Sequence, residues 1–218
     1  MKKANEKVLY IIGGVNGAGK STFVNRVMQP FSDCIYLNPD EMAKNQFGDY
    51  SSKANWMAGR EVLKILKDTA KQGKPIIWET VLGNKTFFQI CDLYRNNGYL
   101  IDLTYIFLEN EETHRARINN RVNNGGHNIN NEILTKRFNN RAINFDKAKK
   151  IADVWKLLSN EDPWIEVVAF GNGSITTSIT NYDLYNDFYN TTPKNNNNIE
   201  NKFKKIMGFA IRQNILVR

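Results

Sequence analysis

Cysteine and histidine are scarce in this sequence of 218 residues, which contains two of each. Cys34 and Cys91 stand in apolar surroundings and lack the spacing of metal ligands, so we expect both to be small core residues. His114 and His127 are too few and too far apart to build a histidine metal site by themselves. These absences argue against a zinc protein and against a domain held together by disulfides.

Long apolar runs are also absent from the sequence. None approaches the roughly 20 residues that a membrane-spanning helix requires. Residues 1–7 carry positive charges but lead directly into a predicted strand, instead of the apolar stretch and cleavage site of a signal peptide. We therefore expect a cytoplasmic protein with no membrane partner. Because 41% of the residues are hydrophobic, a buried core is expected.

The charge of the chain is strongly basic, with a formal net charge of +8. This charge suits a polyanionic partner, but it cannot separate a nucleotide such as ATP from a nucleic acid. Single strands stack on surfaces where aromatic and basic residues are interleaved, and we find no such stripe in the sequence. Nucleic acid is therefore not the favoured partner.

Apolar runs alternate with helical patterns over the first 170 residues, which is typical of an α/β domain with a largely parallel sheet. Continuous apolar runs suit strands that are covered on both faces, and they predict strands over residues 8–12, 34–37, 75–78, 100–107 and 164–170. Predicted helices cover residues 52–72, 85–96 and 111–122, with one or two more over 130–158. Asn110 is the expected N-cap of the helix over 111–122.

The pattern changes after the fifth predicted strand. Residues 171–174, Gly-Asn-Gly-Ser, separate two β-prone runs and predict a hairpin turn. A polar stretch that starts near Thr191 and includes four consecutive asparagines is interpreted as a linker, and residues 199–217 have apolar residues at helical spacing. We therefore expect a domain over residues 1–180 and a C-terminal extension over 181–218, whose helix packs on the core.

The motif with the clearest chemistry follows the first predicted strand and opens a predicted helix. Gly14-Val-Asn-Gly-Ala-Gly-Lys20-Ser21 consists of a glycine, four residues and then Gly-Lys-Ser. Glycines allow the backbone to curl around phosphates with its N–H groups pointing inward. Lys20 then reaches the β- and γ-phosphates, and the Ser21 hydroxyl ligates Mg²⁺. The residues predicted to bind ATP are Gly14, Asn16, Gly17, Ala18, Gly19, Lys20, Ser21 and Thr22.

This phosphate loop refines the predicted fold class. It indicates a P-loop NTPase, a three-layer α/β sandwich with a mainly parallel five-stranded core sheet and a C-terminal extension. The loop predicts nucleotide binding without fixing the reaction, because motors, switches and kinases all share it.

Two carboxylates follow predicted strands at the edge where parallel sheets bind their ligands. Asp40 follows the second strand; it can take the proton of an acceptor hydroxyl, or it can be the N-cap of the next helix. Glu79 ends the third strand, which lies beside the phosphate loop if the strand order is 2-3-1-4-5. There Glu79 either helps to fix Mg²⁺ or holds substrate hydroxyls, and the alternative is a solvated residue at a strand end.

Arginines are frequent after the fourth predicted strand, at positions 115, 117, 121 and 137. Arg117 and Arg121 are four residues apart and therefore share a helix face. An arginine fork suits the charge that spreads over the γ-phosphate oxygens during transfer. The alternative is a basic helix face that is exposed to solvent.

The order of these motifs resembles the zeta-toxin family of P-loop kinases, bacterial enzymes typified by toxins that phosphorylate UDP-N-acetylglucosamine. The resemblance runs from about residue 8 to residue 160. Besides the phosphate loop, it rests on Asn38-Pro-Asp40, Ala58-Gly-Arg60, Glu79-Thr-Val-Leu82, and the segment from Arg117 through Arg121 and Gly125-Gly-His127 to Arg137. The family's Asp-Asn-Ser near the end of the core appears here only as Leu158-Ser-Asn160, so no contact is carried over at that point.

The resemblance implies roles for individual residues of an ATP- and Mg²⁺-dependent kinase. It implies that the catalytic residues are Lys20, Asp40, Arg121 and Arg137. It places at the substrate Asp40, Arg60, Glu79, Thr80 and Arg117, and at the metal Ser21 and Glu79. For Arg60, a structural salt bridge is an equal alternative.

The resemblance also implies an acceptor and a partner. The acceptor is a small molecule with a hydroxyl group, a nucleotide sugar such as UDP-N-acetylglucosamine, and the partner is an antitoxin protein. Two other functions stay open on the sequence. One is a nucleotide-dependent regulatory module without an acceptor, and the other is a polynucleotide kinase.

Overall fold

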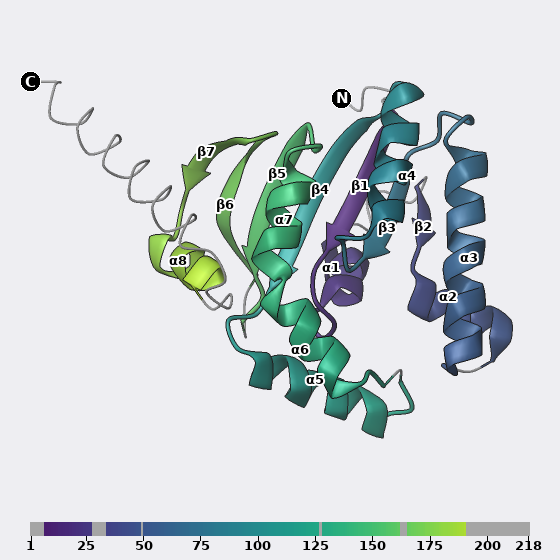
Figure 1. The fold of residues 1–218 in the computed structure, drawn as a ribbon, viewed down its shortest axis with the longest axis horizontal. Coiled ribbons are helices and arrows are strands. Elements are labelled where there is room, and N and C mark those ends of the chain that lie inside the picture. The colour runs from purple at the N-terminus through teal and green to yellow at the C-terminus, as the bar shows by residue number, and fades with distance from the viewer. Residues whose placement is uncertain (1–6, 28–33, 49, 127, 162–164, 191–218) are drawn as a thin grey trace, which may run out of the picture.

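The computed structural model describes residues 7–27, 34–48, 50–126, 128–161 and 165–190 (Figure 1). Its centre is a seven-stranded sheet with the order β2-β3-β1-β4-β5-β6-β7. The strands are β1 (Val8–Gly13), β2 (Ile35–Leu37), β3 (Ile76–Thr80), β4 (Leu100–Phe107), β5 (Val154–Ser159), β6 (Glu166–Asn172) and β7 (Ile175–Ile179). The helices are α1 (Lys20–Val27), α2 (Pro39–Phe47), α3 (Ser52–Thr69), α4 (Lys85–Asn96), α5 (Glu111–Asn123), α6 (Asn131–Asn139), α7 (Arg141–Lys149) and α8 (Tyr182–Asn190).

The predicted fold class is confirmed, with a mainly parallel core in which the first four predicted strands have the order 2-3-1-4. β2, β3, β1, β4 and β5 pair in parallel, whereas β6 and β7 extend the sheet in antiparallel pairs. The predicted hairpin is also confirmed, because Asn172 pairs with Ile175 across the turn. The sheet therefore has seven strands and not five.

The fifth parallel strand was predicted wrongly. Residues 154–159 form β5, although they were assigned to the helices over 130–158, and the run over 164–170 contributes to the antiparallel β6. In β5, Trp155 and Leu157 are buried while Val154 is exposed and Lys156 is half-buried, which is the alternation of a strand. The helical spacing ends with α7 at Lys149.

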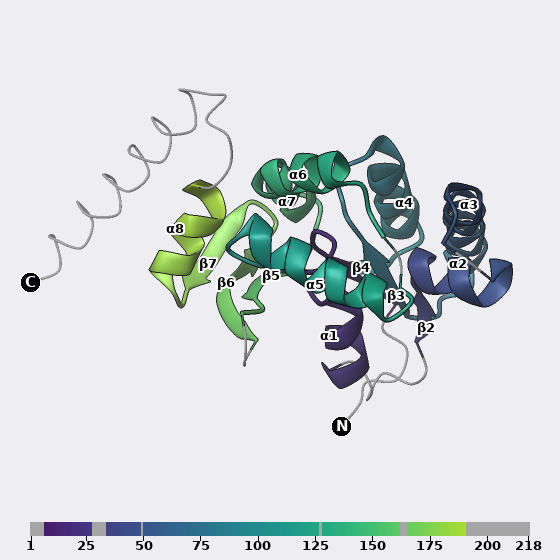
Figure 2. The same ribbon diagram turned by 90° about the horizontal axis from the view of Figure 1, so that it is seen from below.

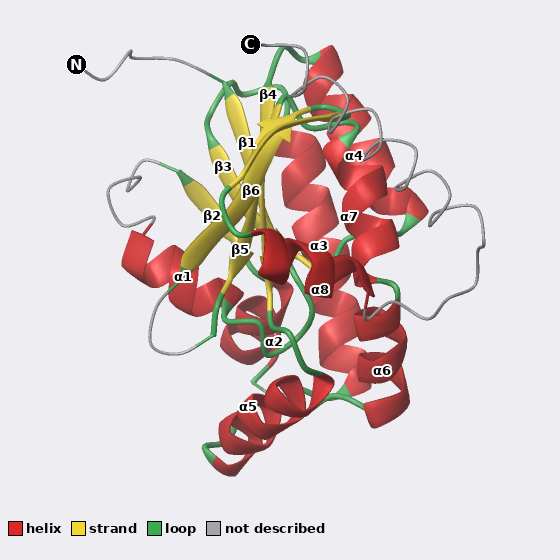
Figure 3. Cartoon of the chain, turned by 90° about the vertical axis from the view of Figure 1, so that its left-hand side faces the viewer, coloured by secondary structure: helices red, strands yellow, loops and turns green. Residues whose placement is uncertain are grey.

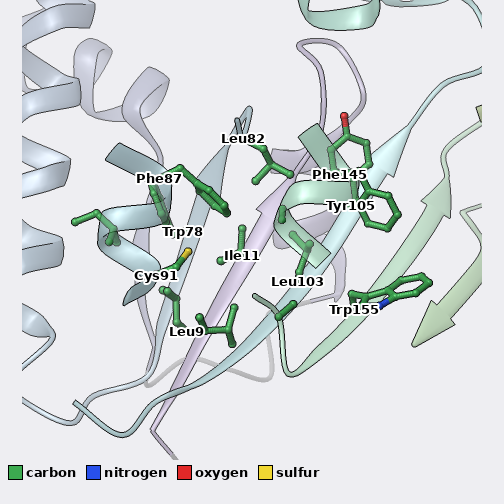
Figure 4. Close-up of a cluster of buried hydrophobic side chains, with 14 of the residues drawn as sticks. Leu9, Ile11, Trp78, Leu82, Phe87, Cys91, Leu103, Tyr105, Phe145 and Trp155 are labelled. Atoms are coloured by element: carbon green, nitrogen blue, oxygen red, sulfur yellow. The ribbon is translucent and has the colours of Figure 1, made fainter. Parts of the chain in front are cut away.

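Helices cover both faces of the sheet and so complete the three layers (Figure 3). On one face, α3, α4 and α7 pack on the larger apolar cluster, part of which is seen in Figure 4 around Leu9, Ile11 and Leu103. On the other face, α1 packs through Phe23 and Val24. Cys91 is buried in the larger cluster as predicted, and Cys34 is half-buried against the smaller one.

The beginning of the expected C-terminal extension packs on the sheet. α8, which was not predicted, buries Tyr185 and Phe188 in the larger cluster beside Phe145. The expected linker and the helix over 199–217 lie outside the described residues. Among the helices that the structure describes, none combines the length and the apolar character needed to cross a membrane.

Candidate active site

The phosphate loop joins β1 to α1, and three of its glycines have backbone conformations that other residues rarely adopt. Gly14, Gly17 and Gly19 have φ angles of 148°, 82° and 89°. A Cβ atom would lie 2.3 Å from the Ile106 carbonyl oxygen at Gly14, and 2.2 Å from Asn160 Nδ2 at Gly19. Only glycine therefore fits at these points, and the loop keeps the open concave backbone that suits phosphate groups.

Lys20 is the first residue of α1, and it is buried at the loop. Its Nζ donates to the Val15 carbonyl oxygen at 3.3 Å and lies 3.8 Å from Glu79 Oε1. Burial lowers the pKa of Lys20, while the nearby charges of Glu79 and Asp40 oppose this change. A desolvated cation at a helix N-terminus is well placed to bind phosphate oxygens.

Glu79 is buried and not a solvated residue at a strand end. Its Oε2 accepts hydrogen bonds from Ser21 Oγ at 2.9 Å, Tyr36 OH at 2.8 Å and Asn38 Nδ2 at 3.0 Å. Burial and the Glu79 charge raise the pKa of Tyr36, so the phenol keeps its proton and donates it. Hydroxyl and carboxylate oxygens are ligands that Mg²⁺ prefers, so the adjacent Ser21 and Glu79 fit this ion.

Asp40 lies in the first turn of α2 and does not cap it. The cap is Asn38, whose side chain accepts from the backbone N–H groups of Asp40 at 2.9 Å and Glu41 at 3.4 Å. The interpretation of Asp40 as an N-cap is therefore wrong. Its carboxylate is partly exposed, and Oδ2 lies 3.7 Å from Arg121 Nη1 of α5. Asp40 thus faces the segment that carries the predicted catalytic arginines.

Asn16 connects the phosphate loop to α5 and α6. Its backbone carbonyl lies 2.7 Å from Nδ1 of the buried His114, which therefore carries a proton on that nitrogen. Its side-chain oxygen accepts from Arg137 Nη1 at 2.7 Å. In Figure 2, α5 crosses the carboxyl ends of the strands, and the hydrogen bond to Asn16 fixes Arg137 of α6 beside the loop. His127 lies outside the described residues.

Asn160 is a loop contact that the sequence did not reveal. It follows β5, and its Nδ2 donates to the Ala18 carbonyl oxygen at 2.7 Å. Its own carbonyl accepts from Arg117 Nη2 at 2.9 Å. Arg117 is therefore held close to the loop through Asn160. The correct strand assignment for β5 would have placed Asn160 at the ligand-binding edge of the sheet.

A cavity of about 450 Å³ opens between the phosphate loop, α2, the start of α3 and α6. Its lining residues are Asn16, Lys20, Asn38, Pro39, Asp40, Tyr50, Ser52, Asn55, Glu79, Thr80, Val81, Asn128, Ile129, Asn130, Ile133 and Arg137. Nine predicted site residues do not line it: Gly14, Gly17, Ala18, Gly19 and Ser21 of the phosphate loop, and Thr22, Arg60, Arg117 and Arg121. Arg117 and Arg121 lie on α5 as described above, Thr22 is exposed on α1, and Arg60 is exposed on α3 over the ring of Trp56.

A family model described as Zeta toxin matches residues 1–163. The chain belongs to the zeta toxin family. The geometry of the phosphate loop agrees with this membership. A curated relative, an uncharacterized protein of Haemophilus influenzae, is 29% identical over 134 residues, which are 62% of this chain and 93% of the relative.

Two solved structures show the same fold. A chain of the AvrRxo1-ORF1:ORF2 complex with ATP matches 88% of this chain with a TM-score of 0.66 and 18% identity. The structure of the PezAT toxin–antitoxin system of Streptococcus pneumoniae matches 99% of this chain and 90% of its own, with a TM-score of 0.62 and 14% identity. This chain spans 65–66% of the length of the AvrRxo1 chains that it matches.

The contact between Asn16 and Arg137 gives a first prediction for this member of the zeta toxin family. Asn16→Ala is expected to lower kcat about tenfold with little change in KM for ATP, because Arg137 loses the group that orients it. The double variant Asn16→Ala/Arg137→Ala is expected to be about as slow as Arg137→Ala alone, since both changes remove one interaction. Steady-state kinetics of the three variants measure this coupling.

The matched control for this cycle is Asn119→Ala, which removes an exposed amide from α5 and should leave kcat unchanged. If the decrease in kcat of the double variant equalled the product of the two single decreases, Asn16 would not act through Arg137.

His114 gives a second prediction, for stability against pH. Burial lowers the pKa of His114 to about 4, which the hydrogen bond to Asn16 only partly offsets. Because the pKa in the folded state lies below the unfolded value, the stabilisation is complete above about pH 6.5 and is lost as pH falls towards 4. The loss amounts to at most about 3 kcal/mol.

The comparison for this prediction is His114→Asn, whose amide can replace the Nδ1 donor but does not titrate. Urea unfolding from neutral pH to about pH 4.5 should show a steeper loss of stability for the wild type than for the variant. Equal losses in both proteins would show that His114 does not supply this dependence.

Proposed function

We propose that this chain transfers the γ-phosphate of Mg²⁺-ATP to a hydroxyl of a nucleotide sugar such as UDP-N-acetylglucosamine. The observation that carries the proposal is that the phosphate lysine Lys20 and the carboxylate of Asp40 line one cavity with Arg137. A phosphate-binding cation, a base and a charge-stabilising arginine are the groups that phosphoryl transfer to an alcohol requires.

The donor end of the cavity is formed by the phosphate loop. The loop N–H groups and Lys20 bind the β- and γ-phosphates, and Ser21 and Glu79 would hold the ion. When bound, Mg²⁺ supplies positive charge that neutralises the phosphate oxygens. Arg137 and Arg121 stabilise the charge that spreads over the transferring group.

The transfer step follows from the position of Asp40 at the same cavity. The acceptor oxygen forms a bond to the γ-phosphorus while the bond from that phosphorus to the β–γ bridging oxygen breaks, and ADP leaves. The proton of the acceptor hydroxyl passes to the Asp40 carboxylate. No other reactant is needed to balance this step.

The acceptor end of the cavity supports a sugar as the reacting group. It is lined by neutral hydrogen-bonding side chains, among them Tyr50, Asn55, Asn128 and Asn130. The cationic lining residues, Lys20 and Arg137, lie on the phosphate-loop side instead. Amides and hydroxyls pair well with sugar hydroxyl and acetamido groups. Membership in the zeta toxin family supports an antitoxin protein as the partner.

The test is a screen for transfer of labelled γ-phosphate from ATP to nucleotide sugars, nucleosides, free sugars and oligonucleotides. We expect label on a nucleotide sugar. Label that appears only in inorganic phosphate would instead favour a nucleotide-dependent regulatory module, and label on an oligonucleotide would favour a polynucleotide kinase.

A further inference from the structure

The outer face of α3 carries a continuous row of basic side chains around one exposed tryptophan. With about 3.6 residues per turn, the members of this row fall within an arc of about 80° along a helix of about 27 Å. We call it the α3 stripe, and it consists of Lys53, Trp56, Arg60, Lys64, Lys67 and, in the following turn, Lys71. All six residues are exposed.

The stripe is a feature of the fold and not of the linear sequence. Its six residues are spread over positions 53–71, with apolar and acidic residues between them. The opposite face of α3 is buried through Val62 and Leu66, which fixes the stripe on the outside of the molecule (Figure 1). The six residues are not contiguous in the sequence, and they come together in one row only because residues 52–69 form a helix.

Trp56 is unusual for a surface residue. Its side chain is 61% exposed, and the Arg60 guanidinium lies 4.7 Å from the ring centroid. A cation over one face of an exposed indole leaves an amphipathic platform with a flat apolar ring and a charged edge. Tryptophan and arginine are also among the residue types that contribute most to binding at protein interfaces.

The charges of the stripe are crowded along one face of the helix. Arg60 with Lys64, Lys64 with Lys67, and Lys67 with Lys71 are like-charge neighbours at helical spacing, and such pairs are destabilising. The acidic residues of α3 are Glu61, whose carboxylate lies 3.9 Å from Lys64 Nζ, and Asp68. Both flank the stripe and do not interrupt it. Five cations in one row on the outer face of a helix suit a polyanionic ligand.

We propose that the α3 stripe binds single-stranded nucleic acid, with the cations on successive phosphates and Trp56 stacked on a base. A positive groove or ridge combined with an aromatic platform is how proteins hold single strands without reading their sequence. An acidic protein partner fits less well, because a protein interface needs an apolar core and the stripe offers a single aromatic ring among five cations. The proposal does not depend on which acceptor the cavity takes.

The test uses fluorescence anisotropy of a labelled single strand of thymidines with the full chain, with saturating Mg²⁺-ATP present to occupy the phosphate loop. The triple variant Lys64→Gln/Lys67→Gln/Lys71→Gln is expected to bind the strand at least about tenfold more weakly. The slope of log affinity against log salt concentration should become shallower by about 2, because three phosphate contacts are lost. Trp56→Ala should lower the affinity for the strand about tenfold or more, because no base can stack on the missing indole ring. Trp56 fluorescence should also be quenched on binding.

The matched control is Lys85→Gln/Lys147→Gln/Lys150→Gln, which removes the same charge from exposed positions on α4 and α7 and just after α7. It is expected to bind like the wild type. The proposal would be overturned if the wild type did not bind the strand at physiological salt, or if the control and stripe variants were weakened equally. It would also be overturned if Trp56→Ala kept its full affinity for the strand and the wild type bound polyglutamate equally tightly. The last outcome would mark the stripe as a surface for acidic proteins.

Discussion

Lys20→Ala is expected to slow phosphotransfer about a thousandfold or more while the fold stays intact. The Lys20 ammonium is buried at the phosphate loop, where charges interact far more strongly than at the surface. The fold should persist because the neighbouring carboxylate keeps hydrogen bonds from Ser21, Tyr36 and Asn38. The measurement is the rate of γ-phosphate transfer together with a thermal melt of the same sample.

The control for this substitution is Lys147→Ala, which removes an exposed lysine from α7 and should keep the wild-type rate. A folded Lys20→Ala variant with nearly full activity would show that the loop does not bind the phosphates of the donor. Equal slowing by both variants would instead attribute the effect to net charge.

The fold could be predicted wherever a local pattern decides the structure. The four strands β1 to β4 are continuous apolar runs, and the helices over 52–72, 85–96 and 111–122 correspond to α3, α4 and α5. β5 could not be separated from the preceding helices, because no glycine or proline lies between Lys149 and Val154. Its place is fixed by parallel pairing with β4, from Asp102 with Val154 to Phe107 with Ser159. Such long-range pairing is not visible in local periodicity.

The site was predicted where a residue belongs to a contiguous motif, and it was missed where strands bring distant residues together. Tyr36 lies in β2 and Asn38 follows it in extended backbone two residues later, so both side chains point to the same side, towards Glu79 on the adjacent β3. Two polar residues at the end of an otherwise apolar strand were the sequence pattern that could have indicated their place in the site. Asn110 is the N-cap residue of α5 as predicted, but its side chain makes no cap hydrogen bond.

Asp40→Asn is expected to reduce phosphotransfer to the acceptor at least about a hundredfold, with ATP binding largely retained. An amide cannot accept the hydroxyl proton, and losing general-base catalysis typically costs about 10²- to 10⁴-fold in rate. Stability should stay within about 1 kcal/mol of the wild type, because the cap is Asn38 and the substitution removes only a helix-dipole contact and a partly exposed ion pair with Arg121. Single-turnover transfer at saturating ATP and acceptor, beside a thermal melt, measures both effects.

Glu41→Gln is the matched control, because Glu41 is the other acidic residue in the first turn of α2 and does not line the cavity. It removes a similar helix-dipole contact but should leave the transfer rate unchanged. A slow Asp40→Asn variant beside a fast Glu41→Gln variant therefore separates proton transfer from helix electrostatics. Full-rate transfer by Asp40→Asn would remove Asp40 from the mechanism and leave Glu79, the other carboxylate that lines the cavity, to be tested as the base.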